Sequence, residues 1–456
     1  MRAGLPVLDS ADAGVRLGFA PVPAAAPAPT ADAFVPHVVA WNLTKRCNLE
    51  CAHCYIAAGS WQATDNELTA AECHRISDEI LEISPAPLFI LSGGEPLLRD
   101  DLEEIAAHAN SRGATVVVGT NGTRLTTGRI RSLKAAGVTG VAISVDSLDE
   151  RYHDRFRHSG GALRDTLDAV TRLREEELDF VVQTSLTRGN RREIPALAAW
   201  SAERGAVSFN LYFLVSTGRG ESMRGLTPAE NDEVLRELAM LERVYRGRML
   251  VRSKCQPQIM RHAYETDPAS PLLNYGTRCP CGVHYCRITP EGRLTPCPYT
   301  PAVAGDLRTN AFAEIWRGSP VFTRLREETP GGKCGICEYR QVCGGCRARA
   351  YADSGDLMAE DASCAYQPAG DRPLVRPARS VTYGQPVADS GMAWTAEAKA
   401  RLDRVPGFVR AVVMGRIEKY ARERGHDCVT REVMEAVRRE MPVDFSKRAP
   451  FFMKES

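Results

Sequence analysis

Residues 41–55 read WNLTKRCNLECAHCY and place three cysteines, Cys47, Cys51 and Cys54, in the spacing C-x3-C-x2-C. Three thiolates on one short loop can hold three irons of a 4Fe-4S cluster and leave the fourth iron open to a small chelating ligand. Paired C-x2-C hooks are typical of structural zinc, and ordinary electron-transfer clusters use four cysteines. The spacing therefore predicts a cluster that acts on a molecule it binds. A zinc knuckle or a structural loop is the alternative interpretation.

A second motif, GGEP at residues 93–96, follows this loop. The two motifs together resemble the signature of the radical S-adenosylmethionine (SAM) enzymes, over about residues 36–225. The resemblance implies that the three cysteines ligate a 4Fe-4S cluster and that the amino and carboxylate groups of SAM chelate its open iron. Cleavage of SAM then yields a 5′-deoxyadenosyl radical that abstracts hydrogen. The family commonly has an aromatic residue before the third cysteine, and His53 takes that place here.

Composition bounds the class of protein. The chain has 456 residues, which suggests two or three domains, and 44% of them are hydrophobic. Lys and Arg number 58 against 57 Asp and Glu, so no net charge favours nucleic acid or an anionic membrane. No apolar run reaches about 18 residues, which predicts no membrane span, and no signal peptide is visible. The 15 cysteines cluster in C-x2-C patterns, which favours iron–sulfur ligation in a reducing, oxygen-poor cytoplasm.

Apolar and amphipathic segments alternate after the first cysteine loop. Short β-rich runs such as PLFILSGG, ATVVVGTNG and GVAISVDS are separated by amphipathic stretches such as DLEEIAAHANSRG. Repeated βα units predict an α/β fold, a partial (β/α)6 barrel with a parallel sheet of about six strands. In such a sheet, polar residues at the carboxyl ends of the strands line the site. The motifs GGEP, TNG and SVDS fall at these ends.

The resemblance places candidate SAM-binding residues at these strand ends. Gly93 and Gly94 lack Cβ atoms, so the backbone can approach a ligand closely, and Pro96 holds the turn. Glu95, or a carbonyl beside it, can accept hydrogen bonds from the SAM ammonium group. A strand-end turn or a helix cap has a similar local sequence and is the alternative. The further candidates are Asn121 in TNG, and Ser144 and Asp146 in SVDS, which matches the strand-four motif for the methionyl and ribose part of SAM.

The stretch RYHDRFRHSGGAL resembles the loop after strand four in a subgroup of these enzymes. There Arg157 is a candidate partner of the SAM carboxylate. The subgroup usually has Gly after this Arg, where this chain has His158. Lone Arg and His residues are often solvated surface, so this is the alternative for Arg157, His153 and His158.

A second cysteine-rich segment spans residues 279–364 and resembles the SPASM extension of radical SAM enzymes. Gly292 and Cys297 fit its G-x4-C hairpin. The resemblance implies one or two auxiliary 4Fe-4S clusters. One would be held by Cys334, Cys337, Cys343 and Cys364. The other would be held by Cys297 and Cys346 with two of Cys279, Cys281 and Cys286.

This segment departs from the common pattern in two ways. Three cysteines compete for two places, and the gap between Cys343 and Cys346 is one residue shorter than usual. The spacing C-x2-C-x5-C-x2-C also fits zinc, which is the alternative. Cys73, Cys255 and Cys428 lie outside the motifs and are interpreted as packed thiols.

The sequence divides into six segments. An Ala/Pro-rich, disordered leader precedes the radical SAM core, and a helical connector leads to the SPASM auxiliary-cluster domain. A linker rich in Pro, Gly and Ser then leads to a small helical domain. The predicted bounds are 1–35, 36–225, 226–278, 279–366, 367–392 and 393–456.

Two stretches of the sequence indicate the class of substrate. VCGGCRARAYADSGDLMAEDASCAYQP, with WNLTKRCNLECAHCY, resembles the NirJ and AhbC/AhbD group of haem and haem d1 biosynthesis. Residues 394–441 look like the small C-terminal domain of light-independent protochlorophyllide reductase, which helps cover a tetrapyrrole substrate. Both resemblances imply an oxidoreductase or lyase that removes or oxidatively decarboxylates side chains of an iron tetrapyrrole. A generic three-helix bundle is the alternative for the tail.

The implied partners are the tetrapyrrole and reduced ferredoxin or flavodoxin as the electron donor. The substrate carboxylates need basic groups, for which Arg219, Arg347 and Arg349 are candidates by position. One alternative is a SPASM maturase that modifies a ribosomally made peptide. Another is a non-enzymatic iron–sulfur carrier, which leaves GGEP and SVDS without a role.

Overall fold

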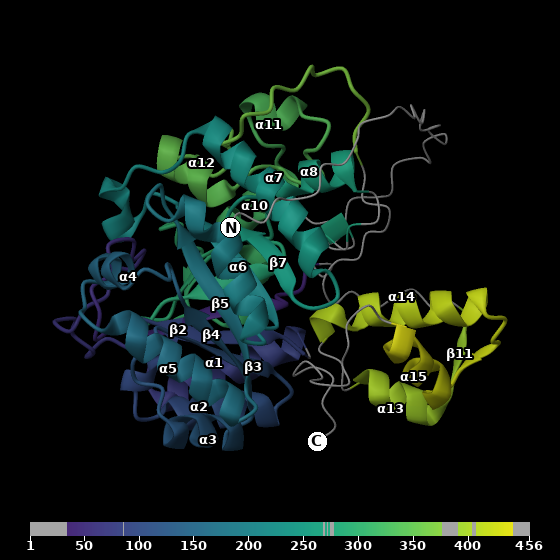
Figure 1. Cartoon of the computed structure of the whole chain (residues 1–456), viewed down its shortest axis with the longest axis horizontal. Helices are drawn as coiled ribbons and strands as arrows, with labels where there is room; N and C mark the ends of the chain where they lie inside the picture. Colours follow the sequence, from purple (N-terminus) through teal and green to yellow (C-terminus); the bar gives the residue numbers. More distant parts are fainter. Residues whose placement is uncertain are drawn as a thin grey trace, which may run out of the picture.

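A ten-stranded sheet in the order β10-β9-β8-β1-β2-β3-β4-β5-β6-β7 organises the molecule (Figure 1). The computed structural model describes residues 34–84, 86–267, 270, 272–273, 278–375, 391–403 and 407–440. Strands β1 to β7 are parallel and follow the chain order, and β8 pairs in parallel with the other edge of β1. The predicted α/β fold with a parallel sheet of the radical SAM type is confirmed.

The strands of this sheet are short, as expected for repeated βα units. Their bounds are β1 (Val38–Thr44), β2 (Leu88–Gly93), β3 (Thr115–Thr120), β4 (Val138–Ser144), β5 (Asp179–Leu186), β6 (Ser208–Phe213), β7 (Leu250–Lys254), β8 (Tyr285–Ile288), β9 (Arg293–Thr295) and β10 (Gly305–Asp306). β9 and β10 extend the sheet as antiparallel strands.

Helices alternate with the parallel strands, and α1, α2, α3 and α5 lie together on one side of the sheet (Figure 1). The helices of this region are α1 (Ala70–Ile83), α2 (Leu102–Ser111), α3 (Thr127–Ala135), α4 (Glu150–Arg157), α5 (Ala162–Glu175), α6 (Ile194–Glu203), α7 (Pro228–Tyr245) and α8 (Ile259–Thr266), with short 3-10 turns η2 (Pro96–Leu98), η3 (Arg191–Glu193) and η4 (Gly218–Ser222). In the cysteine-rich segment they are α9 (Phe312–Gly318), α10 (Pro320–Glu327), α11 (Gly332–Ile336) and α12 (Arg347–Ser354).

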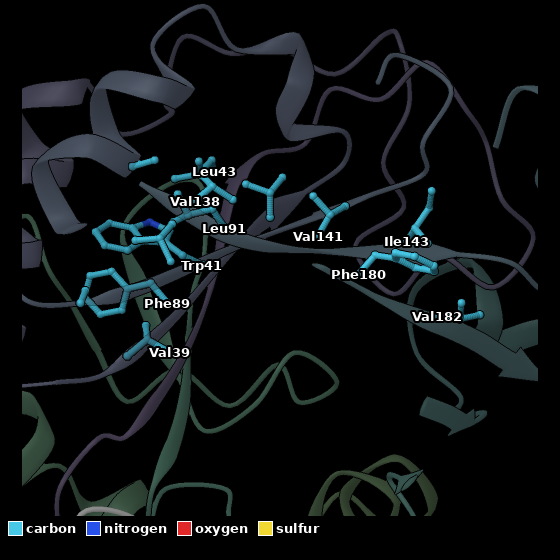
Figure 2. Close-up of a cluster of buried hydrophobic side chains, with 14 of the residues drawn as sticks. Val39, Trp41, Leu43, Phe89, Leu91, Val138, Val141, Ile143, Phe180 and Val182 are labelled. Carbon is cyan, nitrogen blue, oxygen red and sulfur yellow. The ribbon is translucent and has the colours of Figure 1, made fainter. Parts of the chain in front are cut away.

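The two faces of the strands differ in character. Alternate residues of the central strands, such as Trp41, Phe89 and Phe180, are fully buried in the core, and Figure 2 shows these side chains gathered along the strands. The intervening positions are small or polar near the strand ends, for example Ser92 and Ser144. Because side chains alternate between faces, this pattern leaves one face free to line a site.

Strand β7 is a difference from the sequence-based expectation. The sequence predicts a helical segment over 226–278, and α7 and α8 lie there, but β7 runs between them and, with β8, brings the parallel set to eight strands. Val251 is the one buried residue of this strand, and a five-residue strand with so short an apolar pattern is hard to distinguish from a loop.

The C-terminal unit has its own small core. It contains β11 (Ala393–Trp394), α13 (Ala396–Asp403), α14 (Gly407–Glu423), β12 (Cys428–Val429) and α15 (Arg431–Glu440), drawn in yellow tones in Figure 1. Ala398 of α13, Ile417 of α14 and Val433 of α15 pack together. The helices were expected from the sequence, whereas the short β11–β12 pair was not.

Some predictions fall on residues that the structure does not describe. The leader lies outside the described residues except for its last two positions, and so do residues 376–390 of the linker and 441–456 of the tail. Across the described part of the chain, no helix is both long and apolar enough to cross a bilayer.

Candidate active site

The first cysteine loop begins where β1 ends, at the carboxyl edge of the sheet. Cys47 and Cys51 are buried and Cys54 is half-buried, and all three line one cavity. The Cys47 amide donates to the Gly59 carbonyl at 3.2 Å, and the Gly59 amide donates back to the Lys45 carbonyl at 3.2 Å. These paired bonds close the loop and hold the thiols toward the cavity.

Each thiol of the triad receives an N–H donor. The contacts are Leu49 N to Cys47 Sγ at 3.4 Å, Ala58 N to Cys54 Sγ at 3.3 Å and Arg157 Nη1 to Cys51 Sγ at 3.6 Å. Burial raises the pKa of Cys47 to about 12, so its thiolate needs a compensating positive charge. Bound iron supplies that charge, and hydrogen bonds to the sulfurs set the potential of a cluster. The donor set therefore fits three ligands of an iron–sulfur cluster.

Gly93 and Gly94 place the GGEP turn directly on the cysteine loop. The Gly94 amide donates to the Thr44 carbonyl at 2.7 Å, and the Glu95 amide donates to the Arg46 carbonyl at 2.8 Å. A Cβ on Gly94 would lie 2.1 Å from the Arg46 carbonyl oxygen. A Cβ on Gly93, whose φ is +147°, would lie 2.4 Å from the Thr44 carbonyl oxygen. Only glycine permits this backbone contact, which fixes the start of the cysteine loop.

The Glu95 carboxylate is fully buried and holds the neighbouring backbone rather than lining the cavity. Its Oε1 accepts from Thr120 Oγ1 at 2.8 Å and from the Leu97 amide at 3.1 Å, and its Oε2 accepts from the Asn121 amide at 2.9 Å. Burial raises the pKa of this carboxyl above its usual value. The predicted contact with the SAM ammonium group therefore falls to carbonyls of the turn, and it stays a prediction.

Asn121 and Ser144 both line the cavity, at the ends of β3 and β4. Asn121 Nδ2 donates to Asn48 Oδ1 at 3.0 Å and lies 3.9 Å from Cys47 Sγ. The amide thus connects the TNG turn to the cysteine loop. Their predicted contacts with SAM stay predictions, and their positions beside the thiols are compatible with them.

Asp146 and Arg157 form a buried pair behind the triad. Arg157 Nε and Nη2 lie 2.7 and 2.5 Å from Asp146 Oδ2, and Asp146 Oδ1 accepts from the Ser185 amide at 2.8 Å. Burial raises the pKa of Asp146, but the charge of Arg157, together with His53, His153 and the hydrogen bond from the Ser185 amide, holds the pKa below its usual value. Arg157 lines the cavity and Asp146 does not, so Asp146 positions Arg157 toward Cys51.

The two histidines of this stretch have different surroundings. His153 is buried, and its Nδ1 lies 3.3 Å from the Asp146 amide nitrogen. His158 is exposed and ends α4 with a φ of +52°. Glycine adopts this left-handed conformation without strain, which explains physically why a Gly suits the position after Arg157.

His53 stacks on Phe156, with ring centroids 4.5 Å apart and an interplanar angle of 6°. Burial lowers the pKa of His53 to about 4, so the ring is neutral near pH 7. A neutral stacked imidazole can replace the aromatic ring that commonly precedes the third cysteine.

Arg219, on η4, donates hydrogen bonds to the backbone of the cysteine loop. Its Nε donates to the Cys51 carbonyl at 2.9 Å, and its Nη1 donates to the Ala58 carbonyl at 2.7 Å. Its Nη2 is buried and has no partner among the described residues, although Arg219 lines the cavity. A buried donor without a partner is costly, and an anionic group in the cavity would satisfy it. The sequence named Arg219 by position alone, and the structure gives it a place beside the triad.

Four tyrosines also line this cavity, and we call them the tyrosine wall. They are Tyr55, Tyr212, Tyr285 and Tyr299. Tyr55 and Tyr299 have ring centroids 5.1 Å apart, and Tyr285 and Tyr299 also pack against a second group of thiols. The cavity holds about 1160 Å³ of empty space, including the part open to solvent.

Four cysteines surround a smaller cavity in the second cysteine-rich segment. They are Cys334, Cys337, Cys343 and Cys364, the set that the resemblance assigns to one auxiliary cluster. The Asp361 amide donates to Cys334 Sγ at 3.4 Å, and the Gly345 amide donates to Cys343 Sγ at 3.5 Å. Thiols around one space with N–H donors suit a cluster there, and this ligand set stays a prediction.

A further group contains Cys279, Cys281, Cys297 and Cys346, which are buried together with Val215 and Ala348. Cys255, interpreted from the sequence as a packed thiol, lies against this group. Cys286 does not. It is fully buried in the main core on β8, beside Val39 of β1. Cys73 also lies in that core, on α1.

Arg347 and Arg349 are buried and bind backbone instead of lining the main cavity. Arg347 Nη1 donates to the carbonyls of Leu357 at 3.0 Å and Ala359 at 2.7 Å. Arg349 donates to the carbonyls of Cys255 at 2.9 Å and Leu214 at 3.0 Å. These contacts shape the cysteine-rich segment, while Arg347 Nη2 is buried without a partner among the described residues.

Sequence reasoning missed Asp361 and the tyrosine wall. The fully buried Asp361 carboxylate accepts from the Cys346 amide at 2.8 Å, while the Asp361 amide donates to Cys334 Sγ, so this residue joins both auxiliary thiol groups. Tyr212 could have been found from strand alternation, since it is the penultimate residue of β6 and lies on the face opposite the buried Leu211. Asp361 has no comparable signal, because its partners come together only in the fold.

Three family models match the chain. The radical SAM superfamily matches residues 41–200, an iron-sulfur cluster-binding (SPASM) domain matches residues 279–347, and the proto-chlorophyllide reductase 57 kD subunit matches residues 394–438. The matches agree with the resemblances found in the sequence.

Curated relatives cover most of their own length. An AdoMet-dependent heme synthase from Methanosarcina barkeri is 38% identical over 343 residues, which are 73% of this chain and 97% of the relative. A pre-heme d1 synthase from Dinoroseobacter shibae is 30% identical over 351 residues, 72% of this chain and 85% of the relative. A PqqA peptide cyclase from Bradyrhizobium diazoefficiens is 28% identical over 353 residues, 74% of this chain and 89% of the relative.

Among solved structures, Streptococcus suis SuiB bound to S-adenosylmethionine matches with a TM-score of 0.60. The match covers 73% of this chain and 78% of SuiB at 14% identity. At this identity the likeness shows the shared fold alone.

Proposed function

The chain belongs to the radical SAM superfamily, in the NirJ-like group that carries a SPASM domain, and on this premise we propose that it removes or oxidatively decarboxylates side chains of an iron tetrapyrrole in haem or haem d1 biosynthesis. The observation that carries the proposal is one cavity lined by the thiol triad and by tyrosines that pack on a second thiol group. A substrate in this cavity would contact both the site for radical formation and the tyrosines that pack on the second thiol group.

Radical SAM domains bind a 4Fe-4S cluster and SAM, and SPASM domains bind auxiliary iron–sulfur clusters, as predicted for this chain. When bound at Cys47, Cys51 and Cys54, the first cluster would supply an electron that cleaves SAM to a 5′-deoxyadenosyl radical able to break an unactivated C–H bond. The protein residues orient and shield this chemistry. Arg157 and the free Nη2 of Arg219 provide positive charge beside the triad for the carboxylate of SAM.

The tyrosine wall is the proposed seat of the macrocycle. A planar tetrapyrrole can stack on or meet the edges of aromatic rings, and Tyr55, Tyr212 and Tyr299 offer such rings in the cavity. Tyr285 and Tyr299 also pack on the second thiol group, which contains Cys279, Cys281, Cys297 and Cys346 and is called the first auxiliary site below. A substrate on the tyrosine wall would therefore lie next to this site. That proximity suits removal of the electron left after oxidative decarboxylation. Reduced ferredoxin or flavodoxin is the proposed external electron donor.

Lys254 is a proposed partner of a substrate carboxylate. In the β6–β7 register it pairs with Tyr212, so the two side chains leave the same face of the sheet. Burial lowers the pKa of Lys254 to about 8, and no ion pair of this lysine exists within the described part of the chain. An incoming carboxylate would supply the missing counter-charge.

The C-terminal unit supports the tetrapyrrole proposal independently. It matches a family named for the reductase of protochlorophyllide, which is itself a tetrapyrrole. We propose that this unit helps to cover the substrate.

Binding of tetrapyrroles by anaerobically purified protein tests this function. An iron porphyrin with free propionates is expected to show a shifted Soret band on binding, and its methyl ester is expected to bind more weakly because it lacks the carboxylates. Lys254→Met should weaken binding of the acid and leave binding of the ester unchanged. The similarity to a peptide cyclase favours peptide modification as the second candidate. Absence of any Soret shift, together with SAM cleavage stimulated by a peptide, would favour that candidate.

A further inference from the structure

Five thiols lie together at this site, whereas a 4Fe-4S cluster has four irons, one at each metal corner of its cube, for them to bind. Cys279, Cys281, Cys297 and Cys346 form one buried group, and Cys255 packs against it from the end of β7. The SPASM match begins at residue 279, so it does not include Cys255. This thiol therefore joins the group through the fold and not through the motif.

Cys279 and Cys281 are placed to fill a single corner. One residue separates them in the chain, and their Sγ atoms lie 3.4 Å apart, within thiol–thiol contact. Ligands at two corners of a cube bind different irons, and in this arrangement the two sulfurs, which are in direct contact, occupy one corner between them. One corner is then left for a thiol outside this pair.

Cys286 cannot reach that corner. Its strand β8 pairs in parallel with β1, and its register partner Val39 is fully buried in the main core. Cys286 is also fully buried there, among apolar side chains. Its neighbour Tyr285 points to the opposite face, toward the cavity and the thiol group.

Cys255 is held in position by the segment that begins at Cys346. Arg349 Nη1, on helix α12 directly after Cys346, donates to the Cys255 carbonyl at 2.9 Å. Arg349 also contacts the Gln256 side chain, and Ser253 Oγ donates to the Gln256 carbonyl at 2.9 Å. These contacts fix the turn after β7 against the thiol group.

We propose that Cys255 is a ligand of the first auxiliary cluster, with Cys297, Cys346 and one of Cys279 and Cys281. The cluster would then be bonded to Cys255, directly after β7. This strand pairs with β6, whose Tyr212 lines the substrate cavity. The proposal rests on a cluster being present at this site and is independent of the identity of the substrate.

The test uses the full chain with Cys47, Cys51 and Cys54 all changed to Ala, so that only auxiliary clusters contribute iron. In this background, Cys343→Ala shows how much iron is lost with the other auxiliary cluster, the one assigned to Cys334, Cys337, Cys343 and Cys364. Cys255→Ala is expected to lose up to about four irons per chain and to change the EPR spectrum of the reduced protein. Cys286→Ala and Cys428→Ala are matched controls expected to keep the iron content and the spectrum.

Cys255→Ser distinguishes loss of a cluster ligand from simple misfolding of the Ala variant. An alkoxide ligand can retain the cluster, so this variant is expected to keep more iron than the Ala variant and to show a shifted reduction potential. Unchanged iron, spectrum and potential in both Cys255 variants would overturn the proposal, and loss of iron in Cys286→Ala would point to Cys286 instead. If the background protein binds no iron, the auxiliary clusters themselves are refuted together with this ligand.

Discussion

Asp146 holds Arg157 against the cysteine triad: its Oδ2 lies 2.7 Å from Arg157 Nε, while Arg157 Nη1 lies 3.6 Å from Cys51 Sγ. Both side chains are almost completely buried. Loss of one partner leaves an uncompensated charge, which costs about 3–5 kcal/mol. Asp146→Asn is therefore expected to lower the free energy of unfolding of the cluster-free protein by about that amount, measured with urea.

Asp168→Asn is the matched control for that change. Asp168 pairs with Arg172 at 3.9 Å on the exposed side of α5, where an ion pair contributes about 0–1 kcal/mol. Equal, small effects of the two substitutions would contradict the positioning role of Asp146.

Gly94→Ala should disrupt the cluster site itself. The new Cβ would lie 2.1 Å from the Arg46 carbonyl oxygen, so the cysteine loop has to move. Reconstituted protein is expected to lose up to about four irons per chain and the EPR signal that SAM perturbs. Gly128→Ala on α3, where a Cβ meets nothing within 4 Å, should leave both unchanged. Normal iron content in Gly94→Ala would show that the GGEP turn does not hold the loop.

His158→Gly should stabilise the protein. A non-glycine residue in the left-handed region costs roughly 1 kcal/mol, and His158 has a φ of +52°. The expected gain is up to about that amount in the free energy of unfolding. Arg155→Gly in the last turn of the same helix should destabilise by up to about 1 kcal/mol. Destabilisation by both substitutions would mean that the His158 side chain contributes more than its backbone costs.

Tyr299→Ala should weaken tetrapyrrole binding, because it removes one ring from the cavity wall. Aromatic contacts contribute about 0.5–1.5 kcal/mol, which corresponds to roughly twofold to tenfold in the dissociation constant measured by Soret titration. Tyr299→Phe keeps the ring and should bind nearly as the parent protein does. Tyr245→Ala, outside the cavity lining, is the control. An affinity unchanged in Tyr299→Ala would place the macrocycle elsewhere.

The sequence predicted what depends on spacing within short segments. The triad, GGEP and the C-x2-C pairs are local patterns, and the alternation of apolar strands with amphipathic helices indicated the parallel sheet. The sequence did not predict which residues far apart in the chain come into contact. The predicted SAM contacts of Asp146, and of Glu95 or a carbonyl beside it, stay predictions, but the sequence did not show that the two carboxylates accept hydrogen bonds from Arg157 and Thr120. The grouping of Cys255 and the separation of Cys286 depend on the register of β7 and β8, which no local motif reveals.

Product analysis tests the central claim most directly. The reconstituted protein would be incubated without oxygen with SAM, a reductant and a panel of iron porphyrins, and the products analysed by mass spectrometry. We predict formation of 5′-deoxyadenosine together with a tetrapyrrole that is lighter by one carboxyl group and one hydrogen for each side chain decarboxylated, or by a whole side chain where one is removed, and neither product in Cys47→Ala. An unchanged tetrapyrrole, with 5′-deoxyadenosine formed only when a peptide is supplied, would contradict the account.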